Sequence, residues 1–134
     1  MTPKKTKYLS IAQVLFIHDQ AVKRFGGSLG VRDLGLVESA VARPKASFDR
    51  QDLYQTIFDK AAALLQSLLK NHPFVDGNKR TALTCAGVFL KINGWNLQNE
   101  HQDEVVFAIK VDNEHLSVEQ ISKWLKDHSV KLSK

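Results

Sequence analysis

The chain has 134 residues, 43% of them hydrophobic and 25% charged, which is typical of a single folded domain spanning residues 1–134 rather than of a disordered chain. Its one cysteine, Cys85, excludes an internal disulfide and a multi-cysteine zinc site, and no apolar run approaches the roughly 18 to 20 residues of a membrane span. The net charge of +5 favours anionic partners without identifying them, and we expect a cytoplasmic protein with no signal peptide and no membrane partner.

The first predicted helix begins after Ser10. Ser10 and Gln13 have the spacing of a capping box, in which two side chains satisfy the free amide groups of a helix start. Apolar residues then recur at helical spacing as far as Phe25, and glycines follow from Gly26. We therefore expect this helix to end at Phe25.

Two further helices are expected before the middle of the chain. The segment 33–42 predicts a short helix, because Pro44 disfavours the helical conformation of the residue before it. The chain is expected to be irregular over 45–52. A wide apolar stripe then predicts a long helix over 53–71, which Pro73 closes off.

The second half of the chain predicts three more helices. Residues 78–92 are apolar almost all round, which is typical of a helix at the centre of a bundle, and Asn93-Gly94 would end it. Helices are also expected over 100–111 and, behind a second capping box, over 118–126. Apart from a short candidate strand at 96–98, the pattern is all-α: about six helices packed around a buried central one.

The stretch HPFVDGNKRTAL, from His72 to Leu83, lies between two of these helices. The first amide groups of a helix lack partners within it and carry partial positive charge, so they bind anions readily. Gly77 would let the backbone approach a phosphate closely. Lys79 and Arg80 fall in the first turn, where cations oppose the helix dipole, and this placement indicates an anion missing from the sequence.

The other polar residues of the stretch complete a set suited to phosphate chemistry. His72, with an unperturbed pKa of about 6.5, can accept a proton from an attacking hydroxyl. Asp76 is a hard oxygen ligand suited to Mg²⁺, which proteins hold with one or two carboxylates and substrate phosphates. Asn78 either holds the loop or contacts a phosphate. Each residue has a structural alternative, such as helix capping by Asp76, but the set as a whole favours a functional site.

The nine residues HPFVDGNKR match at every specified position the signature of the Fic/Doc superfamily, commonly written HxFx(D/E)GN(G/K)R. The stretches GGSLGVRDLGLVESAVARPKASF and VFLKINGW resemble the death-on-curing (Doc) branch of this superfamily. The resemblance covers most of the chain, from about Ser10 to the last helix. It implies a compact helical bundle of the Fic/Doc type.

Two positions separate the chain from the adenylylating members of that superfamily, which continue the motif as GNGRxxR. Lys79 stands at the second glycine and Leu83 at the second arginine. The Doc branch shares both features, and there ATP is thought to present its γ-phosphate to the base. The resemblance thus implies phosphorylation of a threonine on elongation factor Tu by ATP and Mg²⁺, which would arrest translation. The implied roles are His72 as general base, Asp76 as metal ligand, and Gly77, Asn78, Lys79 and Arg80 as the residues that bind the nucleotide.

Two other functions stay open at this stage. One is transfer of AMP to a protein hydroxyl, and the other is a non-enzymatic co-repressor that reaches DNA only through a partner antitoxin. Many Fic proteins inhibit themselves through a glutamate in the pattern (S/T)xxxE(G/N), which pairs with the second motif arginine. No glutamate here precedes glycine or asparagine, and Leu83 replaces the arginine. We therefore expect a separate antitoxin, with a disordered C-terminal segment that folds on binding.

The remaining candidates favour structural roles. Cys85 is expected to be a buried, unreactive thiol. His18 and the three histidines after residue 100 lack the spacing of zinc ligands. The resemblance also implies that the segment 45–52 forms a flap that aligns the target peptide.

Overall fold

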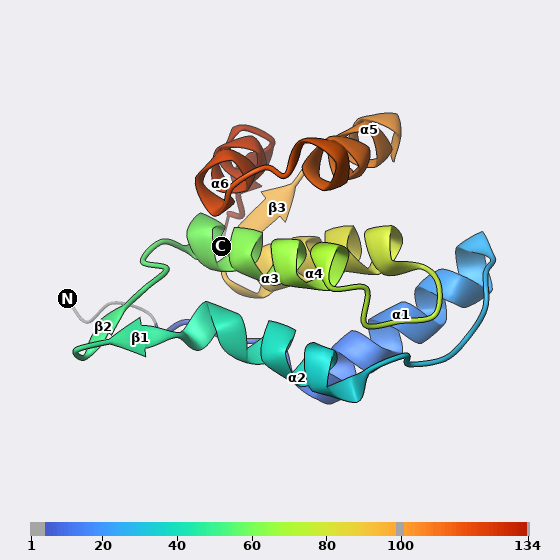
Figure 1. Ribbon diagram of the computed structural model, residues 1–134. Coiled ribbons are helices and arrows are strands. Elements are labelled where there is room, and N and C mark those ends of the chain that lie inside the picture. The colour runs from blue at the N-terminus through green and yellow to red at the C-terminus, as the bar shows by residue number, and fades with distance from the viewer. Residues whose placement is uncertain (1–4, 99–100, 134) are drawn as a thin grey trace.

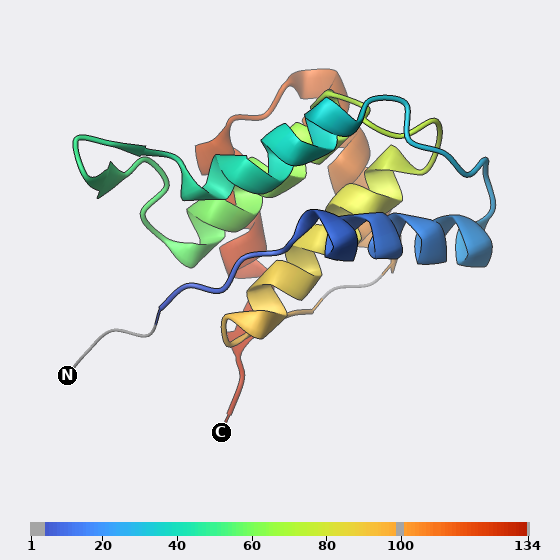
Figure 2. The same ribbon diagram turned by 90° about the horizontal axis from the view of Figure 1, so that it is seen from below.

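The computed structural model describes residues 5–98 and 101–133. Within these residues six α-helices form three layers, with α3 and α4 in the middle, α1 and α2 on one side, and α5 and α6 on the other (Figure 1). The view from below shows α1 crossing α4, whereas α2 runs alongside α3 (Figure 2). The predicted all-α bundle of about six helices is confirmed. The helices are α1 (Ile11–Phe25), α2 (Leu34–Ala42), α3 (Ile57–Lys70), α4 (Asn78–Ile92), α5 (His101–Glu114) and α6 (Val118–Asp127).

Two helices share the centre of the bundle. Ten of the fourteen residues of α3 are buried, against eight of the fifteen in α4. Buried apolar side chains from all six helices form one cluster with these two at its middle. The prediction placed the centre at α4 alone, and the structure shows that the preceding helix is the more enclosed of the pair.

The helix starts follow local side-chain hydrogen bonds. The capping boxes at Ser10 and Ser117 are both present, and Asp33 caps α2. The predicted start of α3 at residue 53 was wrong. The Thr56 hydroxyl accepts a hydrogen bond from the Asp59 amide at 3.0 Å, which begins the helix at Ile57.

Four short strands form two antiparallel pairs. Strand β3 (Trp95–Leu97) confirms the strand expected at 96–98 to within one residue, and it pairs with β4 (Ser129–Lys131) near the end of the chain. Strands β1 (Ser47–Phe48) and β2 (Gln51–Asp52) make a small hairpin after a 3₁₀ turn at Arg43–Lys45. The sequence predicted neither the hairpin nor the partner of β3.

A buried lysine anchors this hairpin. Lys60 is 2% exposed, and its Nζ lies 3.0 Å from Asp52 Oδ2 and 3.3 Å from the Pro44 carbonyl oxygen. The two contacts tie the hairpin and the 3₁₀ turn before it to the first turn of α3, whereas the HPFVDGNKR loop follows the last turn of that helix (Figures 1 and 2). The hairpin therefore lies away from the loop, and the role of residues 45–52 as a flap that aligns the target peptide stays a prediction.

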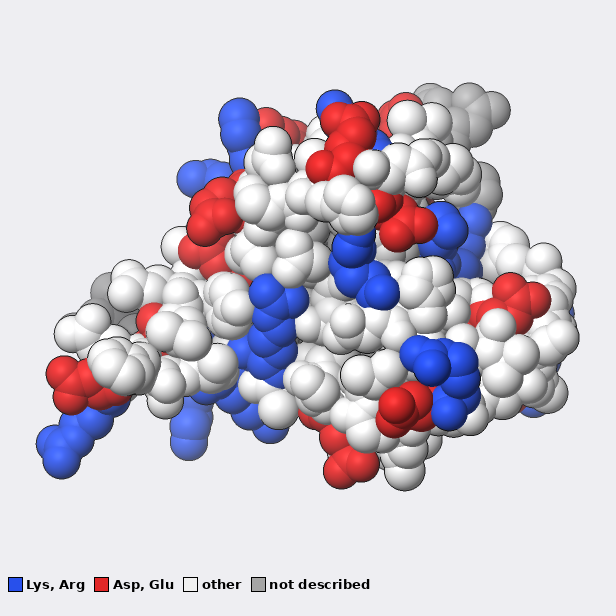
Figure 3. Space-filling view, viewed as in Figure 1, with Lys and Arg blue, Asp and Glu red and all other residues white. Residues whose placement is uncertain are grey.

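The surface carries mixed charge. On the face shown in Figure 3, basic side chains are scattered between acidic ones rather than gathered in one patch. Among the described residues, no helix is long and apolar enough to cross a membrane.

Cys85 lies on α4 in the hydrophobic core of the protein, and we expect its thiol to be unreactive. Its side chain is 0% exposed, and burial raises the pKa of the thiol to about 12. At pH 8 we expect a thiol-reactive dye to label the native protein only as fast as it unfolds, and to label the denatured protein at once. Because the folded pKa is raised, the stability linked to this group is complete below about pH 9 and is lost as the pH rises toward 12. Rapid labelling of the native protein at pH 8 would contradict the burial.

Candidate active site

The turn between α3 and α4 gathers the predicted site residues around one cavity. All six of them line a cavity of about 430 Å³, together with Val75, Leu83 and, from α5, Val105 and Ala108. The six are His72, Asp76, Gly77, Asn78, Lys79 and Arg80. The structure thus brings together every residue that the motif singled out, and adds a wall from α5 that the motif did not contain.

Asn78 holds the turn closed. Its Oδ1 accepts a hydrogen bond from the Phe74 amide, and its Nδ2 donates one to the Phe74 carbonyl oxygen, both at 3.0 Å. Asn78 is 9% exposed, so these bonds are largely shielded from water. Of the two roles open for Asn78, the structure shows the loop-holding one for its side chain.

His18 supports the turn from α1. Its Nε2 lies 2.8 Å from the carbonyl oxygen of Asp76, and its ring stacks on Phe74 with 3.8 Å between centroids. A carbonyl oxygen only accepts, so neutral His18 carries its proton on Nε2. The histidine is 4% exposed. Sequence reasoning missed this contact, since nothing in the chain marks a pairing of residues 58 positions apart.

The segment between α1 and α2 lies directly against the turn. The amides of Ser28 and Gly77 donate to the two oxygens of the Asp76 carboxylate at 3.2 and 2.9 Å. Gly27 has φ +115°, and a Cβ there would lie 2.8 Å from Asp76 Oδ2. A larger residue at position 27 would therefore collide with the Asp76 carboxylate. The segment 26–33, rather than 45–52, borders the site.

His72 is exposed and its backbone is constrained. Its φ of +49° lies in the left-handed region, which costs roughly 1–2 kcal/mol for a residue with a side chain. Arg32 stabilises this conformation, because its Nε and Nη2 donate to the carbonyl oxygens of His72 and Asn71 at 2.7 and 2.8 Å. Among the described residues the His72 ring has no hydrogen-bond partner, which leaves its nitrogens available to a substrate.

The start of α4 is suited to binding an anion. Gly77 is its N-cap, with φ +77°, and no side chain of the described residues caps the helix there. The residues at this end line the cavity, and the first amide groups of a helix lack partners within it and lie at the positive end of its dipole. A phosphate group therefore fits this end of the cavity.

Two cations of the first turn of α4 face carboxylates on α5. Lys79 Nζ lies 3.7 Å from Asp112 Oδ2, and Arg80 Nη1 lies 3.7 Å from Glu104 Oε2. Arg80 also lies over the ring of Phe25, 4.1 Å from its centroid. Sequence reasoning identified both cations and missed both carboxylates, because only the packing of α5 shows that they face the motif.

Asp76 fits a magnesium ion only in part. Each of its oxygens accepts one amide hydrogen bond, which leaves lone pairs free on an exposed carboxylate. The described residues contain no group of three or more histidine, cysteine or acidic side chains that could hold a metal alone. The donor set therefore suits Mg²⁺ that takes its remaining ligands from substrate phosphates and water.

Comparison with known proteins links this arrangement to one family. The model of the Fic/DOC family matches residues 8–90. A protein named Toxin Doc from Mycolicibacterium smegmatis is 54% identical over 92 residues, which cover 69% of this chain and 68% of that protein. Protein kinase doc from Escherichia phage P1 is 33% identical over 88 residues, covering 66% of this chain and 69% of the phage protein.

The geometry predicts that His72 and Phe74 differ strongly in how much they contribute to the stability of the fold. Phe74 is 1% exposed and stacks on His18, so Phe74→Ala should lower the free energy of unfolding by about 3–5 kcal/mol. The exposed His72 ring has no such packing, so His72→Ala should change that free energy little. Urea unfolding of both variants measures the difference. A large loss in the His72 variant would mean that the histidine is mainly structural.

Proposed function

The chain belongs to the Fic/DOC family, and from this premise we propose that it is the toxin of a type II toxin–antitoxin system. In this proposal it is a phosphotransferase that uses ATP and Mg²⁺ to phosphorylate a threonine of elongation factor Tu. The names of the two relatives, a toxin and a protein kinase, support the class of activity. The target, the modified residue and the metal are proposals of this article.

The observation that carries the proposal is the open, cationic start of α4 beside an exposed histidine. No described side chain caps this helix, and Lys79 and Arg80 stand in its first turn. His72 lines the same cavity, and its ring has no hydrogen-bond partner among the residues that the structure describes. A phosphate chain bound at the helix start would thus lie next to a base able to activate a hydroxyl group.

Lys79 and Leu83 favour transfer of the terminal phosphate over transfer of AMP. A lysine at position 79 narrows the space beside Gly77 and adds charge, whereas the apolar Leu83 offers no second arginine for a phosphate chain that runs deeper. Both features support the nucleotide orientation in which the γ-phosphate faces His72.

The chain's own residues would carry out the reaction as follows. His72 accepts the proton of the threonine hydroxyl as its oxygen bonds to the γ-phosphorus and the bond from that phosphorus to the bridging oxygen breaks, releasing ADP. The amides at the start of α4, with Lys79 and Arg80, stabilise the charge on the transferring group. Asp76 would hold Mg²⁺, which neutralises phosphate charge when bound.

The first test is the mass added to the target. We expect the purified protein, incubated with ATP, Mg²⁺ and elongation factor Tu, to add one phosphate group to a threonine, detected by mass spectrometry of the intact and digested target. His72→Ala should lower the rate by at least about 10²–10⁴-fold, the contribution of a general base. The small change in stability expected for this variant makes it a suitable inactive control.

The added mass separates the alternatives. An AMP group on the target would replace the kinase assignment with adenylylation. An unmodified factor, together with a phosphorylated protein elsewhere in a bacterial lysate, would keep the reaction and change its target.

Control by a second protein follows from the pattern of glutamates. The chain lacks the self-inhibitory sequence (S/T)xxxE(G/N), and Leu83 removes the arginine with which its glutamate would pair. We propose an antitoxin whose disordered C-terminal segment folds into a helix on this bundle. The net charge of +5 favours an acidic partner, mainly by speeding its encounter with the toxin.

Expression without an antitoxin tests this control. In a bacterium that lacks the antitoxin gene, the wild-type chain should stop growth, and the His72→Ala variant should accumulate as soluble protein without harm. Equal, vigorous growth with abundant soluble wild-type protein would contradict the toxin assignment.

A further inference from the structure

One side of α5 forms the wall of the cavity opposite the motif. Val105 and Ala108 line the cavity, and Glu104 and Asp112 flank them on the same side of the helix. Residues four positions apart lie above one another on a helix, so residues 104, 108 and 112 make one row. This row has a carboxylate at each end and Ala108 between them.

Each carboxylate lies opposite one motif cation without a hydrogen bond between them. Both N···O distances are 3.7 Å, longer than a hydrogen bond between these groups, so the pairs attract mainly through their charge. The side chains of Glu104 and Asp112 are 25% and 30% exposed, and water screens the attraction only in part. The two carboxylates of this row thus face Lys79 and Arg80, the two cations that would bind a phosphate chain.

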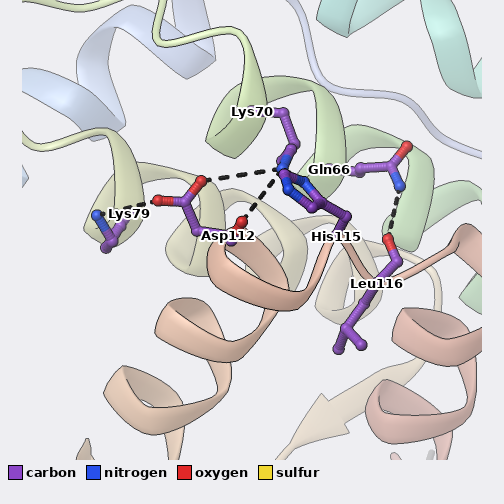
Figure 4. A network of polar contacts seen from close by, with 6 residues as sticks. All are labelled: Gln66, Lys70, Lys79, Asp112, His115 and Leu116. Carbon is purple, nitrogen blue, oxygen red and sulfur yellow. Dashed lines mark hydrogen bonds and ion pairs between the residues drawn. The ribbon is translucent and has the colours of Figure 1, made fainter.

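Asp112 is also held from its other side. Figure 4 shows Lys70, the last residue of α3, contacting the Asp112 carbonyl oxygen at 3.3 Å, its carboxylate at 4.0 Å, and the ring of His115. Gln66 donates to the Leu116 carbonyl oxygen at 2.9 Å and fixes the same end of α5. These contacts fix the backbone of α5 at Asp112, and its carboxylate lies between Lys79 and Lys70, at 3.7 and 4.0 Å.

We propose that Glu104 and Asp112 determine the specificity of the cavity, as fixed counter-ions with which a phosphate chain competes for Arg80 and Lys79. A metal-free polyphosphate would place several negative charges close to both carboxylates, whereas bound Mg²⁺ removes two of those charges. The pair therefore makes the cavity select a metal-bound phosphate chain over a metal-free one. This inference rests on the proposed function only in taking the cavity as a phosphate site.

Calorimetric binding of inorganic tripolyphosphate, with and without Mg²⁺, tests the inference independently of catalysis. Glu104→Gln and Asp112→Asn should each tighten binding of the metal-free ligand by about 2- to 10-fold, and should reduce the advantage that Mg²⁺ gives. Asp127→Asn is the matched control, because it removes one negative charge from a pair with Lys123 on α6, away from the cavity. Thermal unfolding of each variant checks that it folds.

Each result decides the matter. Unchanged or weaker binding by the Gln and Asn variants would overturn the proposal, and so would equal tightening by Asp127→Asn, which would indicate only net charge. Absence of tripolyphosphate binding in all four proteins would overturn it as well. The two proposals can also fail separately. If the two α5 variants bind tripolyphosphate more tightly but the wild-type protein phosphorylates no target, this inference is supported and the proposed kinase activity is contradicted.

Discussion

The pair of hydrogen bonds between the Asn78 side chain and the Phe74 backbone is the constraint on which the site depends. An asparagine at the first position of a helix usually competes for the free amides of that helix, but here both of its polar atoms bind the preceding turn. Asn78 thereby stabilises the turn, and no described side chain occupies the free amide groups at the start of α4. His18 and Arg32 then hold the same turn from outside, through the carbonyl oxygens of Asp76 and His72.

This arrangement forgoes local stability at the start of α4. A serine or aspartate cap in place of Gly77 would stabilise the helix by roughly a few tenths of a kcal/mol, and each acidic residue in the first turn would add about 0.3–1 kcal/mol. The chain instead has Gly77, Lys79 and Arg80, and the compensating negative charge comes from α5, across the cavity. A helix start that depends on a distant helix for its counter-ions is typical of a surface shaped for a ligand rather than for folding alone.

The features that could be predicted from the sequence are those encoded by neighbours along the chain. The capping boxes at Ser10 and Ser117 involve residues three apart, and α4 has the predicted bounds because its end signals adjoin it. The motif residues likewise lie within nine positions and share one cavity. What escaped prediction depends on contacts between distant segments: the pairing of β3 with β4, the contact of His18 with Asp76, and the two carboxylates of α5. Hydrophobic periodicity predicts which face of a helix packs against the core, but it does not predict which polar groups of other segments that helix will contact.

The last turn of α4 has a practical consequence for handling the molecule. The Lys7 backbone exchanges two hydrogen bonds with the Asn93 side chain, and the Leu132 amide donates to the Gly94 carbonyl oxygen. The first and last described segments therefore meet at one end of a fifteen-residue helix, roughly 22 Å long, whose other end opens into the cavity. A dye, an affinity tag or a surface linker joined through either segment would leave the cavity facing outward, so that immobilised protein keeps its binding face accessible to large partners.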